Sequence, residues 1–158
     1  MPLDYPKADD IIDHPACRWT PRAIKVLSTA KAIAGPSGCV EAQHLLLAFE
    51  SVASAYGENL VSRALDRIGL RPSTALGKHA PESCPKNRYV SLKEFDPSLR
   101  AFFPDLVVEE AKKMGNDYVG IEHLLLFLAR VGVTGVELPY ERIRQTILEL
   151  MGEELTGR

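Results

Sequence analysis

The chain has 158 residues, enough for one sizeable hydrophobic core or for two small lobes that share one. Hydrophobic residues make up 46% and charged residues 25%, which argues against global disorder, and a net charge of −2 argues against broad electrostatic binding to nucleic acid. The longest apolar run, from Leu124 to Ala129, is far shorter than the roughly 20 residues that a membrane span needs.

The first 18 residues form an acidic N-terminal extension that carries Asp4, Asp9, Asp10 and Asp13. It does not resemble a signal peptide, and three cysteines, an odd count, fit a reducing compartment rather than a disulfide scaffold. We therefore predict a cytoplasmic protein. The extension could wrap the body, extend into solvent or occupy a groove as a built-in pseudo-ligand.

The first half of the chain contains residues that typically start and end α-helices. Thr20 and Pro21 suit a helix start, because threonine caps a helix and proline fits its first turn, and Gly35 suits its end. The helix from Ala42 is apolar on more than one face and is expected to be central. Helices are predicted at about 21–34, 42–55 and 58–68, with a short turn after Pro72.

Residues 77–94 contain two prolines and scattered basic side chains, and we interpret them as a linker, a solvated connector between two halves. A long helix is predicted from Asp96 to Met114, with Phe102 and Phe103 directed inward and with Pro104 marking either a kink or a late true start. A second central helix follows at about 121–130. The last helix begins near Pro139 and ends before Gly152. Because almost nothing alternates with a period of two, the predicted class is all-α.

The sequence repeats itself. The pattern Val-x-x-x-His-Leu-Leu-Leu spans residues 40–47 and recurs at 119–126, each time after a capped helix, a glycine stop and a short loop. Two copies of a helical half-domain are the simplest account of this pattern. Each half is too small to bury its apolar helix, so we expect duplicated four-helix-type half-domains packed with pseudo-twofold symmetry.

Familiar chemical motifs are absent from the sequence. It contains no P-loop, no dinucleotide-binding glycine motif, no nucleophile elbow and no His-Glu-x-x-His zinc motif. His14, Cys17, His79 and Cys84 could in principle gather around zinc, but the spacing of the last two is loose. We predict neither a catalytic site nor a metal site nor a cofactor.

The second copy, residues 109–126, reads EEAKKMGNDYVGIEHLLL and resembles the Clp repeat, the duplicated N-terminal domain of the Clp/Hsp100 AAA+ unfoldases, with its E-E-A-R-R-L-G-H-N-Y-I-G-T-E-H-L-L-L pattern. In the first copy, Trp-Thr-Pro-Arg-Ala at 19–23 resembles the family's opening. The resemblance divides the chain into an extension (1–18), repeat 1 (19–76), a linker (77–94), a shortened repeat 2 (95–152) and a tail (153–158).

The resemblance implies a protein-binding domain that, in the full-length machines, receives adaptors or substrates for an ATPase ring. We therefore predict a monomeric, non-enzymatic module for adaptor or substrate recognition, or for regulation of a Clp chaperone-protease. Its predicted partners are proteins, namely an unfoldase, a protease subunit, an adaptor or an unfolded substrate, and not nucleic acid or membranes. A decoy that competes with the true N-terminal domain is the main rival among binding proteins.

The resemblance also indicates ligand-binding positions. In some family members, Thr at the first helix start and Glu before the His of each copy hold a phosphorylated arginine. Here the first copy keeps Thr20 but has Gln43 in place of the Glu, and the second keeps Glu122 but has Asp96 in place of the Thr. Because a carboxylate repels phosphate, we predict weak or absent phosphoarginine binding. An unmodified Arg or Lys side chain is a conceivable ligand for Asp96 and Glu122.

Several single residues carry predictions of their own. His44 and His123 occupy equivalent positions and are predicted to be core histidines that brace the preceding loop. Cys39 is predicted to be a small core residue, and Trp19 to pack on the first helix or to line a peptide groove. The alternative function is a small hydrolase or ligand-binding protein that uses His or Cys; alanine changes at the two histidines would separate the classes.

Overall fold

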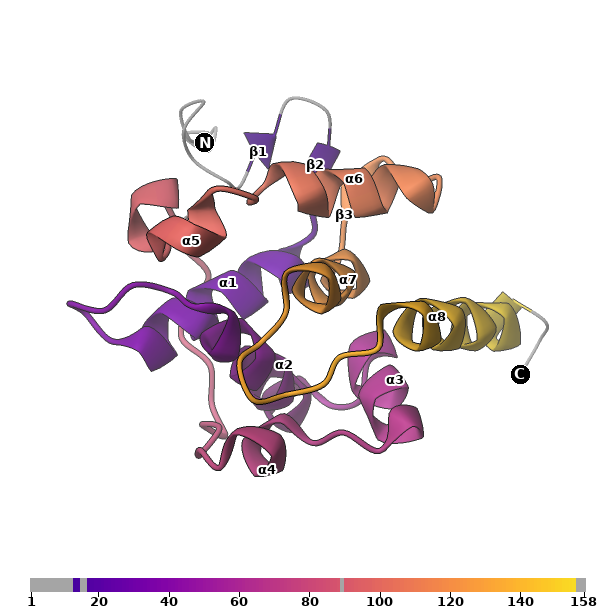
Figure 1. The fold of residues 1–158 in the computed structure, drawn as a ribbon, viewed down its shortest axis with the longest axis horizontal. Coiled ribbons are helices and arrows are strands. Elements are labelled where there is room, and N and C mark those ends of the chain that lie inside the picture. Colours follow the sequence, from indigo (N-terminus) through magenta and orange to yellow (C-terminus); the bar gives the residue numbers. More distant parts are fainter. Residues whose placement is uncertain (1–12, 15–16, 89, 156–158) are drawn as a thin grey trace.

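The computed structural model describes residues 13–14, 17–88 and 90–155, and within them the chain is mainly helical (Figure 1). This confirms the predicted all-α class. The acidic residues Asp4, Asp9 and Asp10, and with them the predicted roles of the N-terminal extension, lie outside the described residues.

The helices of the first half begin and end close to the predicted positions: α1 (Pro21–Ala34), α2 (Ala42–Tyr56), α3 (Leu60–Ile68) and the short α4 (Pro72–Leu76). The second half contains a 3₁₀ turn at Leu92–Glu94 and then α5 (Pro97–Arg100), α6 (Asp105–Lys113), α7 (Ile121–Val131) and α8 (Tyr140–Leu155). The Thr20 hydroxyl caps α1 by accepting a hydrogen bond from the Ala23 amide at 3.1 Å, as the Thr-Pro pair predicts.

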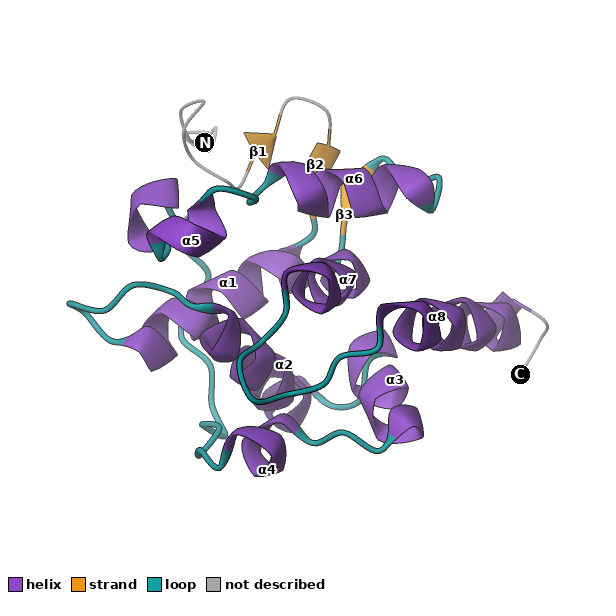
Figure 2. Cartoon of the chain, viewed as in Figure 1, coloured by secondary structure: helices purple, strands orange, loops and turns teal. Residues whose placement is uncertain are grey.

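A small sheet, not predicted from the sequence, lies beside the helices (Figure 2). Its strands are β1 (Asp13–His14), β2 (Cys17–Trp19) and β3 (Tyr118–Val119). Strand β1 runs antiparallel to β2, and β2 pairs in parallel with β3 so that Trp19 lies opposite Val119. The sheet joins the segment before α1 to the segment before α7. The sheet could not be predicted from the sequence, because strands of two or three residues are too short to show an alternating pattern of polar and apolar side chains.

Backbone hydrogen bonds cross between the two halves of the chain in a reciprocal way. The Thr20 amide donates to the Val119 carbonyl at 2.9 Å, and the Asp96 amide donates to the Val40 carbonyl at the same distance. The segment that starts α1 therefore meets the loop before α7, and the segment that starts α5 meets the loop before α2. This exchange is what two pseudo-symmetric copies would produce, and it supports the predicted duplication, which stays a prediction.

The hydrophobic core is centred on α2 and α7, as their apolar sequences predict. Leu45 and Leu46 of α2 are fully buried, and so is every side chain from Leu124 to Leu128 of α7. Each fully buried leucine contributes about 1.5–3 kcal/mol. Helices α1 and α6 pack against these two, so both central helices are covered on several sides.

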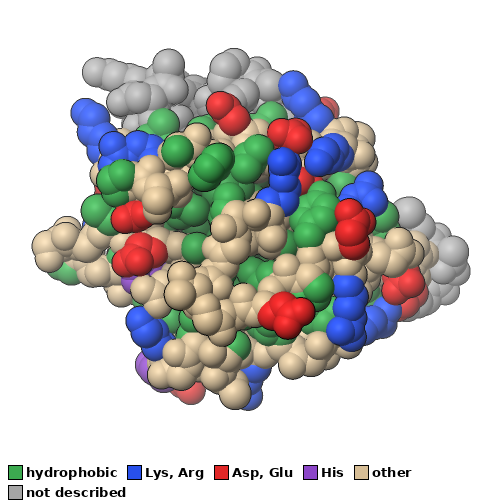
Figure 3. All heavy atoms as spheres, viewed as in Figure 1, with side chains coloured by type: hydrophobic (Ala, Val, Ile, Leu, Met, Phe, Trp, Pro, Cys, Tyr) green, Lys and Arg blue, Asp and Glu red, His purple; other side chains and the backbone are tan. Residues whose placement is uncertain are grey.

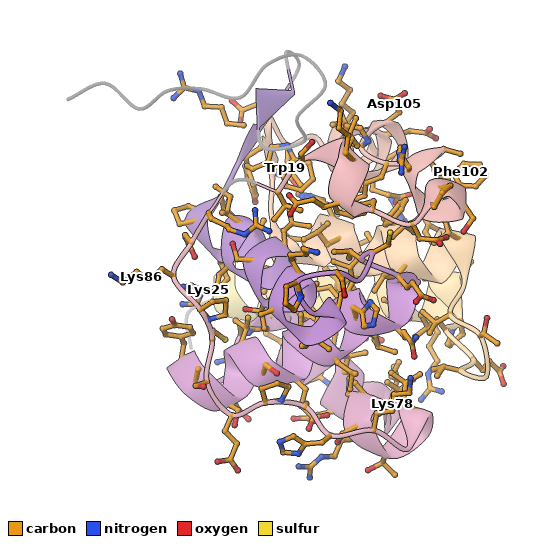
Figure 4. All side chains as sticks on the ribbon, turned by 90° about the vertical axis from the view of Figure 1, so that its left-hand side faces the viewer. Trp19, Lys25, Lys78, Lys86, Phe102 and Asp105 are labelled. Atoms are coloured by element: carbon orange, nitrogen blue, oxygen red, sulfur yellow. The ribbon has the colours of Figure 1, made fainter. Side chains whose placement is uncertain are left out.

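The linker differs from the solvated connector that we expected. Its Val90 is fully buried, and its Arg88 amide donates a hydrogen bond to the Ser28 hydroxyl of α1 at 3.0 Å. The Lys25 ammonium donates to the Pro85 carbonyl, and Figure 4 shows Lys86 pointing away from α1 on this face. The segment therefore lies along α1. Its backbone finds partners on the helix, which composition alone does not reveal.

Three predictions about single positions were wrong. Phe102 is 50% exposed because α6 begins only after Pro104, so Phe102 sits in a turn where the helical period does not apply. Cys39 is exposed because its neighbour Val40 is the buried, bridged residue of an extended segment, in which side chains alternate in direction. Helix α8 continues through Gly152 to Leu155, because a helical glycine costs only about 1 kcal/mol.

Candidate functional site

A groove of about 690 Å³ opens where the two halves of the chain meet. We call it the interlobe groove. It is lined by residues 41–43 at the start of α2 and by Leu76 and Lys78 at the end of α4. Its other lining residues come from the N-cap of α5, from α5 and the turn after it, and from residues 131–134 at the end of α7 and beyond. Two of the four predicted site residues, Gln43 and Asp96, lie on it together. The reciprocal backbone bonds explain this, because they bring the start of α5 to the loop before α2.

Asp96 caps helix α5 from the groove side. Its Oδ2 accepts a hydrogen bond from the Ser98 amide at 3.2 Å and another from the Ser98 hydroxyl. Its Oδ1 accepts no hydrogen bond from any described residue. One carboxylate oxygen is therefore committed to the cap, and the other is available to a ligand in the groove.

Gln43 is paired within the groove. The Lys78 ammonium donates to the Gln43 Oε1 at 2.8 Å, which joins the start of α2 to the residues after α4. Glu41 is exposed on the same rim. Burial lowers the pKa of the neighbouring His44, Glu41 opposes that effect, and Lys78 adds to it.

Apolar side chains form another part of the groove lining. Leu99 and Val133 are almost completely buried, and Phe102 is half exposed. Hydrophobic atoms are exposed around α5 in Figure 3, with acidic and basic side chains beside them. Figure 4 shows Phe102 at the upper right and Lys78 at the lower right of the same face. The groove is thus amphipathic, with charged rims around apolar contacts.

Thr20 and Glu122 belong to a second corner of the molecule. The Thr20 amide bonds to Val119, in the strand that leads to α7, and Glu122 lies in the first turn of that helix. Glu122 is 7% exposed and is hydrogen-bonded to the side chain of Tyr118, and burial raises the pKa of its carboxyl group. A Cβ on Gly120 would lie 2.3 Å from the Glu122 Oε1, so the backbone approaches this carboxyl group closely.

The pairing of these four residues differs from the one that we read along the chain. The sequence assigns Thr20 and Gln43 to one copy and Asp96 and Glu122 to the other. The structure instead brings Thr20 to the segment that leads to Glu122, and Asp96 to the groove that holds Gln43. The corner of Thr20 and Glu122 keeps both the hydroxyl and the carboxyl group that the Clp-repeat resemblance implies. The interlobe groove contains Gln43 and Asp96, the two residues that depart from it.

The two histidines brace loops, as predicted, but only His123 is the core residue that we expected, because His44 is half-buried. The His123 Nδ1 accepts a hydrogen bond from the Gly120 amide at 2.9 Å, and its Nε2 lies 2.8 Å from the Asn116 Oδ1. The His44 Nδ1 accepts from the Glu41 amide at 2.9 Å in the equivalent way. His123 is completely buried, and burial lowers its pKa to about 4, so the ring is neutral at pH 7. Both of its ring nitrogens are engaged in holding the loop before α7.

No cluster of three or more metal-binding side chains was found among the described residues. His79 and Cys84 are described, whereas the side chains of His14 and Cys17 are not, so that predicted combination lies partly outside the described residues. In the same part of the chain, no helix is both long enough and apolar enough to cross a membrane.

Most residues of the groove were not predicted from the sequence, among them Lys78 and Phe102. Lys78 was assigned to the linker, and Phe102 was assigned to the core. No spacing pattern could have found them, because they reach the groove through the packing of four separate segments. Glu41 alone carried a signal, as a polar residue just before a helix.

Comparison with known proteins identifies Clp proteins as relatives. The chain is 30% identical over 150 residues to the negative regulator of genetic competence ClpC/MecB of Bacillus subtilis, which covers 89% of this chain and 18% of that protein. It is 29% identical over 161 residues to the chaperone protein ClpB of Oceanobacillus iheyensis, covering 89% of this chain and 18% of that protein.

A third relative is the ATP-dependent Clp protease ATP-binding subunit ClpA homolog of Guillardia theta, 26% identical over 146 residues, which cover 86% of this chain. The chain thus spans less than a fifth of the length of each of these relatives. No family model matches it.

Proposed function

We propose that this chain is a Clp-repeat module that binds proteins, either adaptors and substrates of a Clp chaperone-protease or the machine itself. Three Clp proteins match most of the chain, and the matched part is a small share of each, as expected for one module of a larger machine. The module is non-enzymatic and acts in the cytoplasm as a monomer.

The interlobe groove is the single observation that carries this proposal. It is a concave surface of about 690 Å³ that combines apolar contacts with charged rims, as surfaces that take an extended peptide segment do. It also lies at the junction of the two halves, where Gln43 and Asp96 replace the family's residues. Binding there requires no bond to be made or broken.

The bonding of the histidines favours a binding function over the alternative of a small hydrolase. A general base needs a ring nitrogen directed at a substrate, with a pKa near the working pH. His123 has neither feature, because it is completely buried and its two nitrogens bond to Gly120 and Asn116. The histidine-to-alanine test therefore predicts loss of folding rather than a folded, inactive protein.

Site-specific photo-crosslinking tests the proposal. Thr134, an exposed residue of the groove, is replaced by p-benzoylphenylalanine, and the intact protein is irradiated in lysate of its source cell. The expected result is a cross-link to a Clp ATPase, a Clp protease subunit, an adaptor or a set of unfolded clients. Mass spectrometry identifies the cross-linked species.

The matched control carries the same photoreactive residue at Leu148, which is 37% exposed on α8, on the other side of the molecule from α5 in Figure 1. A groove-specific partner cross-links from position 134 and not from position 148. Equal cross-linking from both positions, or none from position 134, contradicts protein binding at the groove.

A further inference from the structure

We propose that the interlobe groove selects a protein segment in which an unmodified arginine or lysine side chain lies next to an apolar residue. This inference rests on the proposed function and names the chemistry of the partner. It concerns the corner in which both family positions have changed.

The charges of the groove favour a cation. Asp96 and Glu41 supply two carboxylates, and Lys78 is the only cation among the lining residues. Its ammonium donates to the neutral Gln43 Oε1, and with two carboxylates against one ammonium the lining keeps a net formal charge of −1. The Asp96 Oδ1 is left to accept a charge-assisted hydrogen bond from a guanidinium or ammonium group.

The same groups disfavour a phosphate. An anion at a helix start is normally held by free backbone amides, but the Asp96 Oδ2 already accepts from the Ser98 amide at the start of α5. A phosphorylated arginine would therefore place its negative charge against the carboxylate of Asp96, with Glu41 on the same rim. The carboxylates of Asp96 and Glu41 thus favour an unmodified cationic side chain over a phosphorylated one.

The apolar part of the lining accounts for the second half of the specificity. Phe102 presents an exposed ring, and Leu99 and Val133 line the groove beside it. A phenyl ring attracts an arginine or lysine cation over its face and also packs against an aliphatic neighbour. An acidic or wholly polar segment would make neither contact.

Binding of short peptides tests this inference. Four peptides of the form acetyl-Gly-Leu-Xaa-Phe-Gly-amide, with arginine, lysine, citrulline or phosphoarginine at Xaa, are titrated into the intact ¹⁵N-labelled protein. We expect the arginine and lysine peptides to shift the amide signals of groove residues. The citrulline peptide, which has nearly the same shape without the charge, is expected to bind about tenfold more weakly. The phosphoarginine peptide is expected to bind no better than citrulline.

Matched variants locate the effect. Asp96→Asn keeps an oxygen for the Ser98 cap and removes the charge, and it should weaken arginine binding about fivefold while leaving citrulline binding unchanged. Phe102→Ala should weaken binding of all the peptides. The control Asp66→Asn makes the same chemical change at an exposed position of α3 outside the groove lining and should have no effect.

The outcomes separate this inference from the function on which it rests. Equal binding of arginine and citrulline peptides, tighter binding of phosphoarginine, or an inert Asp96→Asn overturns the cation preference while leaving protein binding in place. If no peptide shifts a groove signal at millimolar concentration, the preference is also overturned. The absence of a cross-link from position 134 would then remove the proposed function as well.

Discussion

The buried ring of His123, part of the repeated Val-x-x-x-His pattern, makes the stability of the fold depend on pH. Its ring is neutral in the folded protein because burial lowers its pKa to about 4, and it accepts a hydrogen bond from Gly120. In the unfolded chain the same ring titrates near its ordinary value of 6.5. Between these two values the unfolded state binds more protons than the folded state.

The free energy of unfolding should therefore fall as the pH drops from about 6.5 towards 4, by up to about 3 kcal/mol from this residue. His44 acts in the same direction, and Glu122 acts in the opposite one because burial raises its pKa. Urea denaturation at a series of pH values measures the slope.

His123→Gln isolates the contribution of His123. Glutamine at this helical position can reach back to the Gly120 amide but does not titrate. The variant should fold at pH 7 and lose stability less steeply between pH 6.5 and 4. An unchanged slope in the variant would show that the ring of His123 is not the group responsible.

Gly120 is a second residue at which the fold constrains the side chain, although its backbone φ of −106° is one that any residue adopts. The constraint is steric: a Cβ would lie 2.3 Å from the Glu122 Oε1 and 3.3 Å from the Tyr118 ring, so the end of the Glu122 side chain would have to move. Gly120→Ala should lower the free energy of unfolding by about 1–3 kcal/mol, measured by urea denaturation. The double variant Gly120→Ala/Glu122→Ala should lose less free energy of unfolding than the two single variants lose in sum, because the clash is then gone. A loss in the double variant equal to that sum would contradict the steric explanation.

At the scale of the element, α8 shows a helix that continues through a glycine. Apart from the neighbouring helix backbone, no atom of the described residues would lie within 4 Å of a Cβ at Gly152. Gly152→Ala should therefore raise the free energy of unfolding by about 0.5–1 kcal/mol, because alanine restricts the unfolded chain and favours the helix. Thermal denaturation followed by circular dichroism measures it, and a lower melting temperature would show that the helix does not extend through this position in solution.

The linker lies along α1, whereas its composition predicted a solvated connector. Its docking depends on Ser28, whose hydroxyl accepts from the Arg88 amide at 3.0 Å. Ser28→Ala should leave that amide unpaired, lower the free energy of unfolding by about 1–2 kcal/mol and speed amide hydrogen exchange within 80–90. The exposed Ser37 provides the control, Ser37→Ala, which should change neither quantity. If amide hydrogen exchange is unchanged in the Ser28 variant, the linker is a solvated connector that does not dock on α1 in solution.

At the scale of the whole molecule, the two halves exchange contacts and should unfold together. Trp19, the single tryptophan, lies with its ring centroid 5.5 Å from that of Phe103, which belongs to the other half of the chain. Its fluorescence therefore reports the junction, whereas circular dichroism reports the helices. We expect the two signals to give one coincident transition in urea. Two separate midpoints would show that the halves are independent lobes.

The features that could be predicted without a structure are those whose causes are local. Thr20 and Pro21 start α1, the leucines of α2 and α7 make those helices central, and His44 and His123 brace the turns before them. Each of these features depends on residues within about four positions of one another, where side-chain spacing and capping act directly.

The places where these elements meet depend on long-range packing, which the folded structure reveals. The Asp96–Val40 and Thr20–Val119 backbone bonds join segments that are distant in the sequence, and no local pattern specifies them. They place Gln43 and Asp96 on one groove, leave Phe102 at its rim and separate both from the Glu122 corner. Gln43 and Asp96 could be named as candidate site residues from the sequence, whereas Lys78 and Phe102 could not. The grouping of all four follows from how the apolar faces of two halves must cover each other.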